Sequence, residues 1–280
     1  MVDSLVTLVR APNPSPMTLD GTNSYLIDGG NGEAICIDPG PAIESHVEAL
    51  LQQCARMRCK LASICLTHGH PDHAPAAAIL RERTGAPIFA HAESRVAHDR
   101  SLSEGDLVRA GDAALRTIVA PGHSSDHLVL YEARERALFT GDVVIGQGFV
   151  LVAPPDGDMR AYLQTLQRLL DECSDARTIY GGHGKPVRDP AAKLREYIEH
   201  RRIRERELIA ALEQGERSVP ELVRSIYVQT DPELWPAAAQ QLLAYLIALE
   251  REGRVRARDL AGEPVYSLTL GNSQNNFPKL

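Results

Sequence analysis

The sequence predicts a mixed α/β domain followed by a small domain of three helices and a β-hairpin. In residues 1–195, short apolar runs alternate with stretches of helical periodicity, which is typical of layered α/β folds. After about residue 200, helical stretches lead into two strands around a turn at Gly262. A third observation is that histidines and aspartates follow directly after several apolar runs, which indicates a site built at strand ends.

The apolar runs of the first domain predict its strands, because each is short and is bounded by turn residues. The expected strands cover residues 5–9, 24–28, 33–38, 61–66, 87–90, 115–120, 127–132, 137–142 and 178–180. The expected helices lie near residues 41–55, 75–84, 159–172 and 190–212. Pro75 suits the first turn of the second of these helices.

The second domain, residues 200–270, has the element order of a winged helix. Helical stretches beginning at His200, Ser218 and Glu233 precede two strands in the segment 254–270. Ser218 is followed three residues later by Glu221, which is the pattern of a capping box at a helix start. Residues 271–280 show no periodicity and are expected to form a mobile tail.

Composition excludes several classes of protein. The 280-residue chain is 44% hydrophobic with a net charge of -7, which is typical of a soluble globular protein and disfavours a dedicated nucleic-acid binder. No apolar run is long enough to cross a membrane, and the N-terminus lacks a signal-peptide pattern. The five cysteines fit no zinc-ribbon spacing. Buried thiols such as Cys36 and Cys65, and a cytoplasmic location, are therefore expected.

The stretch THGHPDH, residues 67–73, directly follows the expected strand 61–66. His68 and His70 are two positions apart, so their side chains project from the same side of an extended chain. Asp72 and His73 then point elsewhere, at the entry to the next helix. Imidazole and carboxylate together are a ligand set suited to zinc. The stretch therefore predicts ligands for two metal ions.

Three further expected strands deliver residues of the same kind. His123 follows strand 115–120, Asp142 ends strand 137–142, and His183 follows strand 178–180. Ligand types that gather at the carboxyl ends of strands make one site. Glycines flank these positions, as tight turns around a crowded centre require.

In this order and spacing, the motifs resemble those of the metallo-β-lactamase fold superfamily, including its first motif at Asp38-Pro39-Gly40. The resemblance covers about residues 5–190 and implies an αββα sandwich with a dinuclear metal site between its halves. It implies that His68, His70 and His123 bind the first metal, that Asp72, His73 and His183 bind the second, and that Asp142 bridges both.

The resemblance also implies roles for residues near the ligands. Asp38 would be a supporting carboxylate that orients the site without binding metal, and His127 would be structural. The remaining histidines match no motif and are expected to be packed or solvated. They are His46, His91, His98 and His200.

Two zinc ions per chain are the expected cofactors, with iron or manganese as alternatives. A water that bridges two zinc ions loses its proton readily, because the metal ions lower its pKa to about 7. The resulting hydroxide is the expected nucleophile. Asp72 is the candidate catalytic residue, since it can orient this hydroxide as well as bind metal.

At several positions the sequence differs from other branches of the superfamily, and these differences indicate which branch it resembles. Asp142 stands where common zinc β-lactamases carry a cysteine, and His70 stands where flavodiiron proteins carry a carboxylate. The short segment between Asp142 and His183 leaves no room for the cap domain of the superfamily's nucleases. The chain most resembles the lactamase-beta-2-like hydrolases, with which it shares GTNSYLI, PGHSSDH, GDVVIGQG and a C-terminal winged helix.

Two functions remain open on the sequence. The favoured one is hydrolysis of a small ester, thioester or lactone, and the alternative is a metal-dependent endoribonuclease or phosphodiesterase acting on single-stranded RNA. Residues 200–280 carry equal numbers of cationic and anionic side chains, and the third helix has few cations. Arginines gather at 201–206 and 254–258. Both groups are interpreted as solvated faces, in preference to a patch that contacts phosphates or a wall of the substrate cleft. No membrane partner is expected, and no oligomeric state is predicted.

Overall fold

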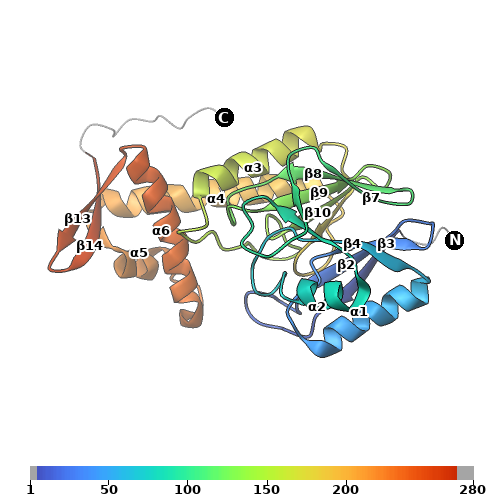
Figure 1. The fold of residues 1–280 in the computed structure, drawn as a ribbon. Coiled ribbons are helices and arrows are strands. Elements are labelled where there is room, and N and C mark those ends of the chain that lie inside the picture. The colour runs from blue at the N-terminus through green and yellow to red at the C-terminus, as the bar shows by residue number, and fades with distance from the viewer. Residues whose placement is uncertain (1–4, 270–280) are drawn as a thin grey trace.

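Two β-sheets lie face to face in the computed structural model, which describes residues 5–269 (Figure 1). The first sheet has the order β1-β2-β3-β4-β5-β6. Its strands are β1 (Val6–Arg10), β2 (Asn23–Asp28), β3 (Glu33–Ile37), β4 (Lys60–Cys65), β5 (Ile88–His91) and β6 (Arg100–Leu102). The strands pair in antiparallel fashion from β1 to β3 and in parallel from β3 to β6.

The second sheet has the order β11-β10-β9-β8-β7. Its strands are β7 (Leu107–Ala110), β8 (Ala113–Val119), β9 (Leu128–Glu132), β10 (Ala137–Gly141) and β11 (Thr178–Gly181). Only the pair β10–β11 is parallel. The carboxyl ends of β10 and β11 therefore lie side by side, which brings the segments that follow them together.

Each sheet buries both of its faces, because alternate residues of a strand point to opposite sides. Ile27 and Ile35 of the first sheet face Leu115, Leu130 and Phe139 of the second in the central core. Helices α1 (Glu44–Met57) and α2 (Ala76–Thr84) cover the outer face of the first sheet. Helices α3 (Met159–Glu172) and α4 (Pro190–Glu213) cover the outer face of the second (Figure 1). The expected αββα sandwich is confirmed.

The expected strands all form, each with ends within two residues of the predicted ones. In the first domain, β6 and β7 were not predicted from the sequence. Both strands are short and have few buried residues. In β6 only Leu102 is buried, and in β7 only Val108 and Ala110 are buried. Such a run is too brief to show the alternation that identifies a strand.

The C-terminal domain has the winged-helix order that the sequence predicts. Its remaining elements are β12 (Arg217–Ser218), α5 (Val219–Ile226), a 3-10 turn η1 (Pro232–Leu234), α6 (Trp235–Arg251), β13 (Val255–Leu260) and β14 (Glu263–Leu268). The capping box forms, since the Glu221 carboxylate accepts hydrogen bonds from the Ser218 amide and hydroxyl. The stretch that begins at His200 is the second half of α4, so the proposed domain boundary falls inside one unbroken helix.

The interpretation of Arg201 as part of a solvated face is wrong. Its side chain is 2% exposed and lies inside the protein, where its guanidinium packs over the ring of Tyr162. Arg202 and Arg206 on the same helix are exposed as expected. The sequence contained no signal for this burial, because Arg201 stands among other arginines and glutamates. The tail at 271–280 lies outside the described residues.

One hydrophobic cluster joins the two domains. It runs from the outer face of the second sheet through Leu166 of α3 and Leu208 of α4 to Leu222 of α5 and Leu242 of α6. Arg160 of α3 adds ion pairs across the same boundary, to Glu205 of α4 and to the residue that follows α6, Glu252. No helix in the described part of the chain is long and apolar enough to cross a membrane.

Because the core is continuous, we expect both domains to unfold together. Leu208→Ala should lower the free energy of unfolding by about 2–5 kcal/mol, since the side chain is fully buried. Urea denaturation followed by circular dichroism should show a single transition, shifted to lower urea. Ile203→Ala on the same helix is the control, since Ile203 is 39% exposed, and it should change stability by no more than about 0.5 kcal/mol. Two separate transitions would contradict the shared core.

Candidate metal centre

All seven predicted ligands meet at one edge of the sandwich. Four of them lie on the loop between β4 and α2, and the other three follow β8, β10 and β11. They are His68, His70, Asp72, His73, His123, Asp142 and His183. The chain crosses the core along four strands and turns at this edge, which is why residues far apart in the sequence come together.

Glycines allow this convergence. A Cβ on Gly182 would lie 2.5 Å from Oδ1 of Asp142, and a Cβ on Gly141 would lie 2.3 Å from Oγ1 of Thr67. Gly141 also has a φ of 45°, which other residues rarely adopt. Any larger side chain at these two positions would push the ligand residues apart.

The ligand atoms form two groups, and Asp142 faces both. One group is His68, His70 and His123, and the other is Asp72, His73, Asp142 and His183. Oδ1 of Asp142 lies 3.3 Å from Nε2 of His183 and 3.5 Å from Nε2 of His73. Its Oδ2 lies 3.8 Å from Nε2 of His123. One carboxylate thus presents an oxygen to each group.

Hydrogen bonds fix which ring nitrogen of His73 and His68 faces the centre. Asp38 accepts a hydrogen bond from Nδ1 of His73 at 3.0 Å, which leaves Nε2 directed inward. Asp38 also accepts from the Thr67 amide and hydroxyl, at 2.7 and 2.6 Å. Since the Thr67 hydroxyl has given its hydrogen to Asp38, its oxygen accepts from Nδ1 of His68 at 3.0 Å. Nε2 of His68 therefore carries a free lone pair.

Backbone carbonyls orient two further imidazoles in the same way. Nδ1 of His123 donates to the carbonyl of Leu151 at 2.8 Å, and Nδ1 of His183 faces the carbonyl of Gly21 at 3.4 Å. Their Nε2 atoms point inward. His70 differs, because its Nδ1 is the inward atom and lies 3.0 Å from Nε2 of His123.

Buried atoms without partners show that the residues fit metal ions. Nε2 of His68, Nε2 of His73 and Oδ1 of Asp142 are all buried and make no hydrogen bond. A buried polar atom without a partner is costly, and in native proteins it calls for an explanation. These three atoms point at the centres of the two groups, where cations would satisfy them.

The two groups differ in charge. Burial keeps the pKa of His68 and of His123 below the usual value, so these two imidazoles of the first group are neutral. In the second group burial opposes charge, but the Asp142 carboxylate raises the pKa of His73 well above its usual value and that of His183 to about 9. The carboxylates beside them thus favour the protonated form of both imidazoles.

His127 lies beneath the first group and supports it. Its ring stacks on His68 with centroids 4.6 Å apart, and its Nε2 accepts the backbone N–H of Asp142 at 3.2 Å. The histidines without a motif stand apart from the ligands. His46, for example, is buried against the hydroxyl of Ser24, and His98 bonds to Ser101.

Three features that contribute to this centre were not predicted from the sequence. Thr67 was absent from every expected role, although it directly precedes the motif and connects Asp38 to His68. Asp156 accepts hydrogen bonds from the amide and hydroxyl of Ser125 and lies 4.0 Å from Nε2 of His70. The segment 142–158, which carries Leu151, contains no helix or strand. No spacing pattern distinguishes such residues from ordinary loop residues.

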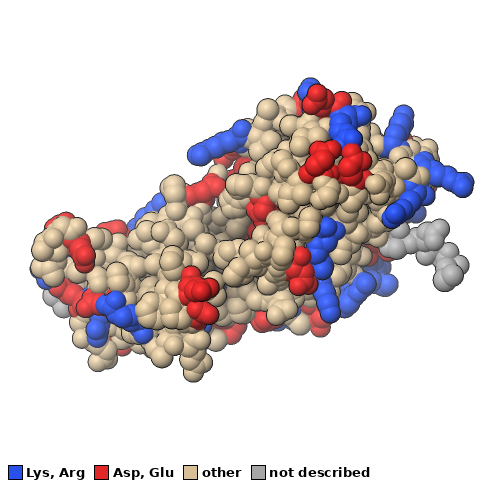
Figure 2. Space-filling view, turned by 90° about the horizontal axis from the view of Figure 1, so that it is seen from below, with Lys and Arg blue, Asp and Glu red and all other residues tan. Residues whose placement is uncertain are grey.

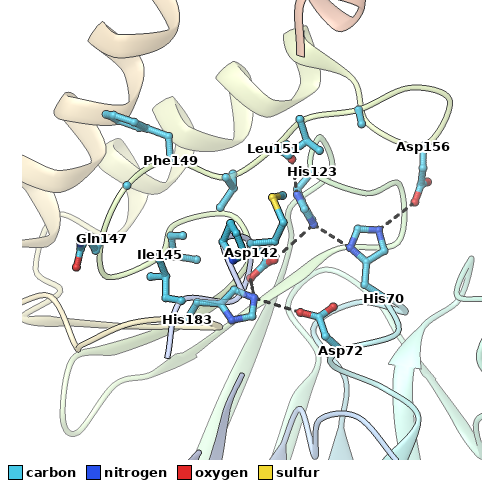
Figure 3. Close-up of a pocket in the computed structure, with 16 residues that line it drawn as sticks. His70, Asp72, His123, Asp142, Ile145, Gln147, Phe149, Leu151, Asp156 and His183 are labelled. Atoms are coloured by element: carbon cyan, nitrogen blue, oxygen red, sulfur yellow. Dashed lines mark hydrogen bonds and ion pairs between the residues drawn. The ribbon is translucent and has the colours of Figure 1, made fainter. Parts of the chain in front are cut away.

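A pocket with a volume of about 280 Å³ opens beside the two groups. His70, Asp72, His123, Asp142 and His183 form its polar side (Figure 3). The opposite wall is largely apolar and comes from two segments, 16–19 and 145–153, with Gln147 as a polar side chain. Its apolar side chains are Pro16, Met17, Leu19, Ile145, Phe149, Val150, Leu151 and Ala153.

An αββα sandwich with metal-binding side chains gathered at its strand ends defines a metal-dependent hydrolase. A model of the metallo-beta-lactamase superfamily matches residues 17–183, and a model of the beta-lactamase associated winged helix domain matches residues 218–262. The chain belongs to the metallo-beta-lactamase superfamily.

Curated relatives match nearly the whole chain. It is 31% identical over 284 residues to the beta-lactamase-like protein 2 homolog of Drosophila melanogaster, covering 94% of each chain. It is also 31% identical over 278 residues to an atrochrysone carboxyl ACP thioesterase of Aspergillus chevalieri, covering 95% of this chain and 87% of the relative.

Solved structures share the complete fold. A beta-lactamase domain protein from Burkholderia ambifaria superposes with a TM-score of 0.82 at 22% identity, covering 96% of this chain and 93% of the other. A metallo-beta-lactamase family protein from Thermus thermophilus gives a TM-score of 0.79 at 23% identity, with coverage of 95% and 99%. At these identities the comparison shows a common fold.

Asp142→Ala should greatly weaken metal retention, because both groups lose the carboxylate that faces them. Protein purified without chelator should carry metal near two ions per chain, whereas the variant should lose at least one of them. The measurement is elemental analysis after dialysis. His98→Ala is the control, since His98 makes its hydrogen bonds outside the two groups, and it should retain the parental metal content. Equal metal content in the two variants would reject the role of Asp142.

Metal binding should release protons at pH 7. His73 and His183 have raised pKa values, so each is protonated at neutral pH in the metal-free protein and must lose that proton to bind a cation. The apparent zinc affinity should therefore rise with pH from neutral pH through about pH 9, the pKa of His183. Calorimetric titration in buffers of different ionisation enthalpy measures the released protons. A binding enthalpy that is independent of the buffer would contradict this expectation.

Proposed function

We propose that this chain is a hydrolase that uses two zinc ions to cleave small esters, thioesters or lactones. The observation that carries the proposal is the pocket, whose wall opposite the candidate ligands is apolar and whose described lining includes no lysine or arginine. A neutral acyl group is stabilised by apolar surroundings, whereas a polyanion is bound through cations. The similarity to an ACP thioesterase supports a thioester among the substrates.

The proposed ligands of the two zinc ions follow the two groups. His68, His70 and His123 would hold the first ion, and Asp72, His73 and His183 would hold the second, with Asp142 shared. Imidazole and carboxylate suit zinc, and the same donors accept iron or manganese. Bound metal ions would lower the pKa of a water molecule and polarise the carbonyl under attack.

Asp72 is the proposed catalytic carboxylate. Its side chain is 28% exposed and lines the pocket, whereas His73 and His183 behind it are almost fully buried. Burial opposes its ionisation, but the imidazoles of His183 and His73, whose Nε2 atoms lie 3.3 and 3.4 Å from its Oδ2, lower the pKa of Asp72, so it is ionised at neutral pH. Its free lone pairs can accept a hydrogen from the attacking water and orient that water toward an acyl carbon in the pocket.

The alternative, cleavage of single-stranded RNA, has less support. Carboxylates already pair with wing arginines, because Arg254 contacts Glu205 and Glu252, and Arg258 contacts Glu216. Figure 2 shows acidic and basic side chains interspersed on the face that it presents, without a continuous basic track. A strand of phosphates needs an unpaired row of cations to release its counterions.

The cysteines support a cytoplasmic location. Cys36, Cys54, Cys59, Cys65 and Cys173 are all free thiols. Four of them are buried, and burial raises the pKa of thiols such as Cys36 and Cys65. Free, unreactive thiols are compatible with a reducing compartment.

Hydrolysis by the zinc-loaded protein should improve with the length of a linear acyl chain. Each added methylene that enters the apolar wall should raise kcat/KM by up to about tenfold. The measurement is a series of acyl thioesters and aryl esters from acetyl to hexanoyl, assayed with lactones, a phosphodiester and single-stranded RNA. Turnover of the acyl series should depend weakly on salt.

RNA cleavage is tested with a double variant, Arg256→Gln combined with Arg258→Gln. This variant leaves the contacts of Arg254 with Glu205 and Glu252 intact. This double variant should hydrolyse the acyl substrates within a few-fold of the parent, because both side chains are exposed and distant from the pocket. RNA cleavage by the parent that is lost both in this variant and in Asp142→Ala would favour the nuclease instead.

A further inference from the structure

The pocket wall includes an irregular segment that also contacts a candidate ligand. Within residues 142–158, Phe149, Val150, Leu151 and Ala153 line the pocket. The carbonyl of Leu151 accepts the hydrogen bond from Nδ1 of His123. The position of this segment therefore sets both the apolar wall and the orientation of His123 (Figure 3).

Two side chains from the C-terminal helices hold this segment. Arg201 of α4 donates to the carbonyl of Val150 at 2.5 Å, and Oε1 of Gln241 on α6 accepts from the amide of Val152 at 3.1 Å. Arg201 also donates to the same Oε1 of Gln241 at 3.0 Å. The peptide groups on both sides of Leu151 are thus fixed from the second domain.

Arg201 is in an unfavourable position for stability alone. Its guanidinium is buried, and no ion pair with a carboxylate is found for it in the described part of the chain. Burying an unpaired cation is costly, and an apolar side chain would serve the core better. Nε2 of Gln241 is likewise buried without a partner. In both side chains, the atoms that contact residues 150–152 have hydrogen-bond partners. Nε of Arg201 and Nε2 of Gln241 have none.

The usual use of a winged helix does not account for these contacts. A nucleic-acid reader of this type presents its third helix to the groove. Here the third helix, α6, buries eight of its residues, Gln241 among them, within the protein. Its polar contact is directed inward, at the pocket segment.

We infer that Arg201 and Gln241 are positioning residues, through which the C-terminal domain holds His123 and the apolar wall in place. The inference rests on the proposed metal-dependent hydrolase. In this role, the winged helix holds residues 150–152 in place and so helps to form the pocket wall. The contacts run from Gln241 and Arg201 to these peptide groups, and from the Leu151 carbonyl to His123 in the first ligand group.

The test compares Gln241→Met with Gln241→Glu in the full-length, metal-free protein. Methionine has a similar shape but no oxygen to accept from the Val152 amide and from Arg201. Glutamate keeps the accepting oxygen, and the amide nitrogen that it replaces has no partner to lose. Zinc affinity is measured by competition with a chromophoric chelator. The weaker site should lose about 10–100-fold in Gln241→Met and stay within about threefold of the parent in Gln241→Glu.

Leu222→Ala is the structural control. Leu222 is buried in α5 of the same domain, so the variant should lower the melting temperature at least as much as Gln241→Met while zinc affinity stays parental. Arg201→Lys is a second variant, because a lysine ammonium keeps the charge but cannot reach both acceptors as a planar fork. It should weaken zinc binding by several-fold.

Two results would overturn the inference. One is equal zinc affinity in Gln241→Met and Leu222→Ala, and the other is a loss in Gln241→Glu as large as in Gln241→Met. The zinc measurement needs no substrate, so it decides the inference even if the parent hydrolyses none of the acyl compounds and the proposed substrate class fails. With an active substrate, Gln241→Met should also raise KM most for the longest acyl chain, which a general loss of stability would not do.

Discussion

The structure depends on one carboxylate that faces two groups of imidazoles. Asp142 directs Oδ1 at His73 and His183 and Oδ2 at His123. Lone pairs on so many inward nitrogens and oxygens repel one another, so the arrangement is stable only with positive charge among them. In the second group, protons supply this charge in the absence of metal, as the raised pKa values of His73 and His183 indicate.

Because the inward-facing lone pairs repel one another, the candidate ligands need hydrogen bonds from the surrounding residues to stay in place. Four of the five imidazoles are held from behind, by Asp38, Thr67 and two backbone carbonyls. Rigid strands bring the ligands to one edge, and glycines let them approach. The Leu151 carbonyl comes from the middle of a long segment without helix or strand, residues 142–158, whereas Gly21 lies two residues before β2. That segment needs an external support, which Arg201 and Gln241 provide.

The sequence predicted most of the fold and all seven candidate ligands, because these features depend on short-range patterns. Apolar runs identify strands, and His68, His123, Asp142 and His183 stand next to such runs. Arg201 and Gln241 could not be predicted in the same way. Arg201 shares its helix with exposed arginines, and only the packing of α6 against α3 and α4 buries it. A contact between residues 40 positions apart leaves no local signal.

Shared packing also bears on why one chain carries both domains. The winged helix has its third helix buried and Arg254 paired with Glu205 and Glu252, so the surfaces that nucleic-acid readers expose are directed inward. In this protein, the winged helix would contribute to the pocket by restricting the position of residues 150–152. The restriction acts through the hydrogen bonds of Arg201 and Gln241 to the peptide groups on both sides of Leu151. Packing elsewhere in the domain, as at Leu222, stabilises the fold but does not itself set the position of the pocket wall.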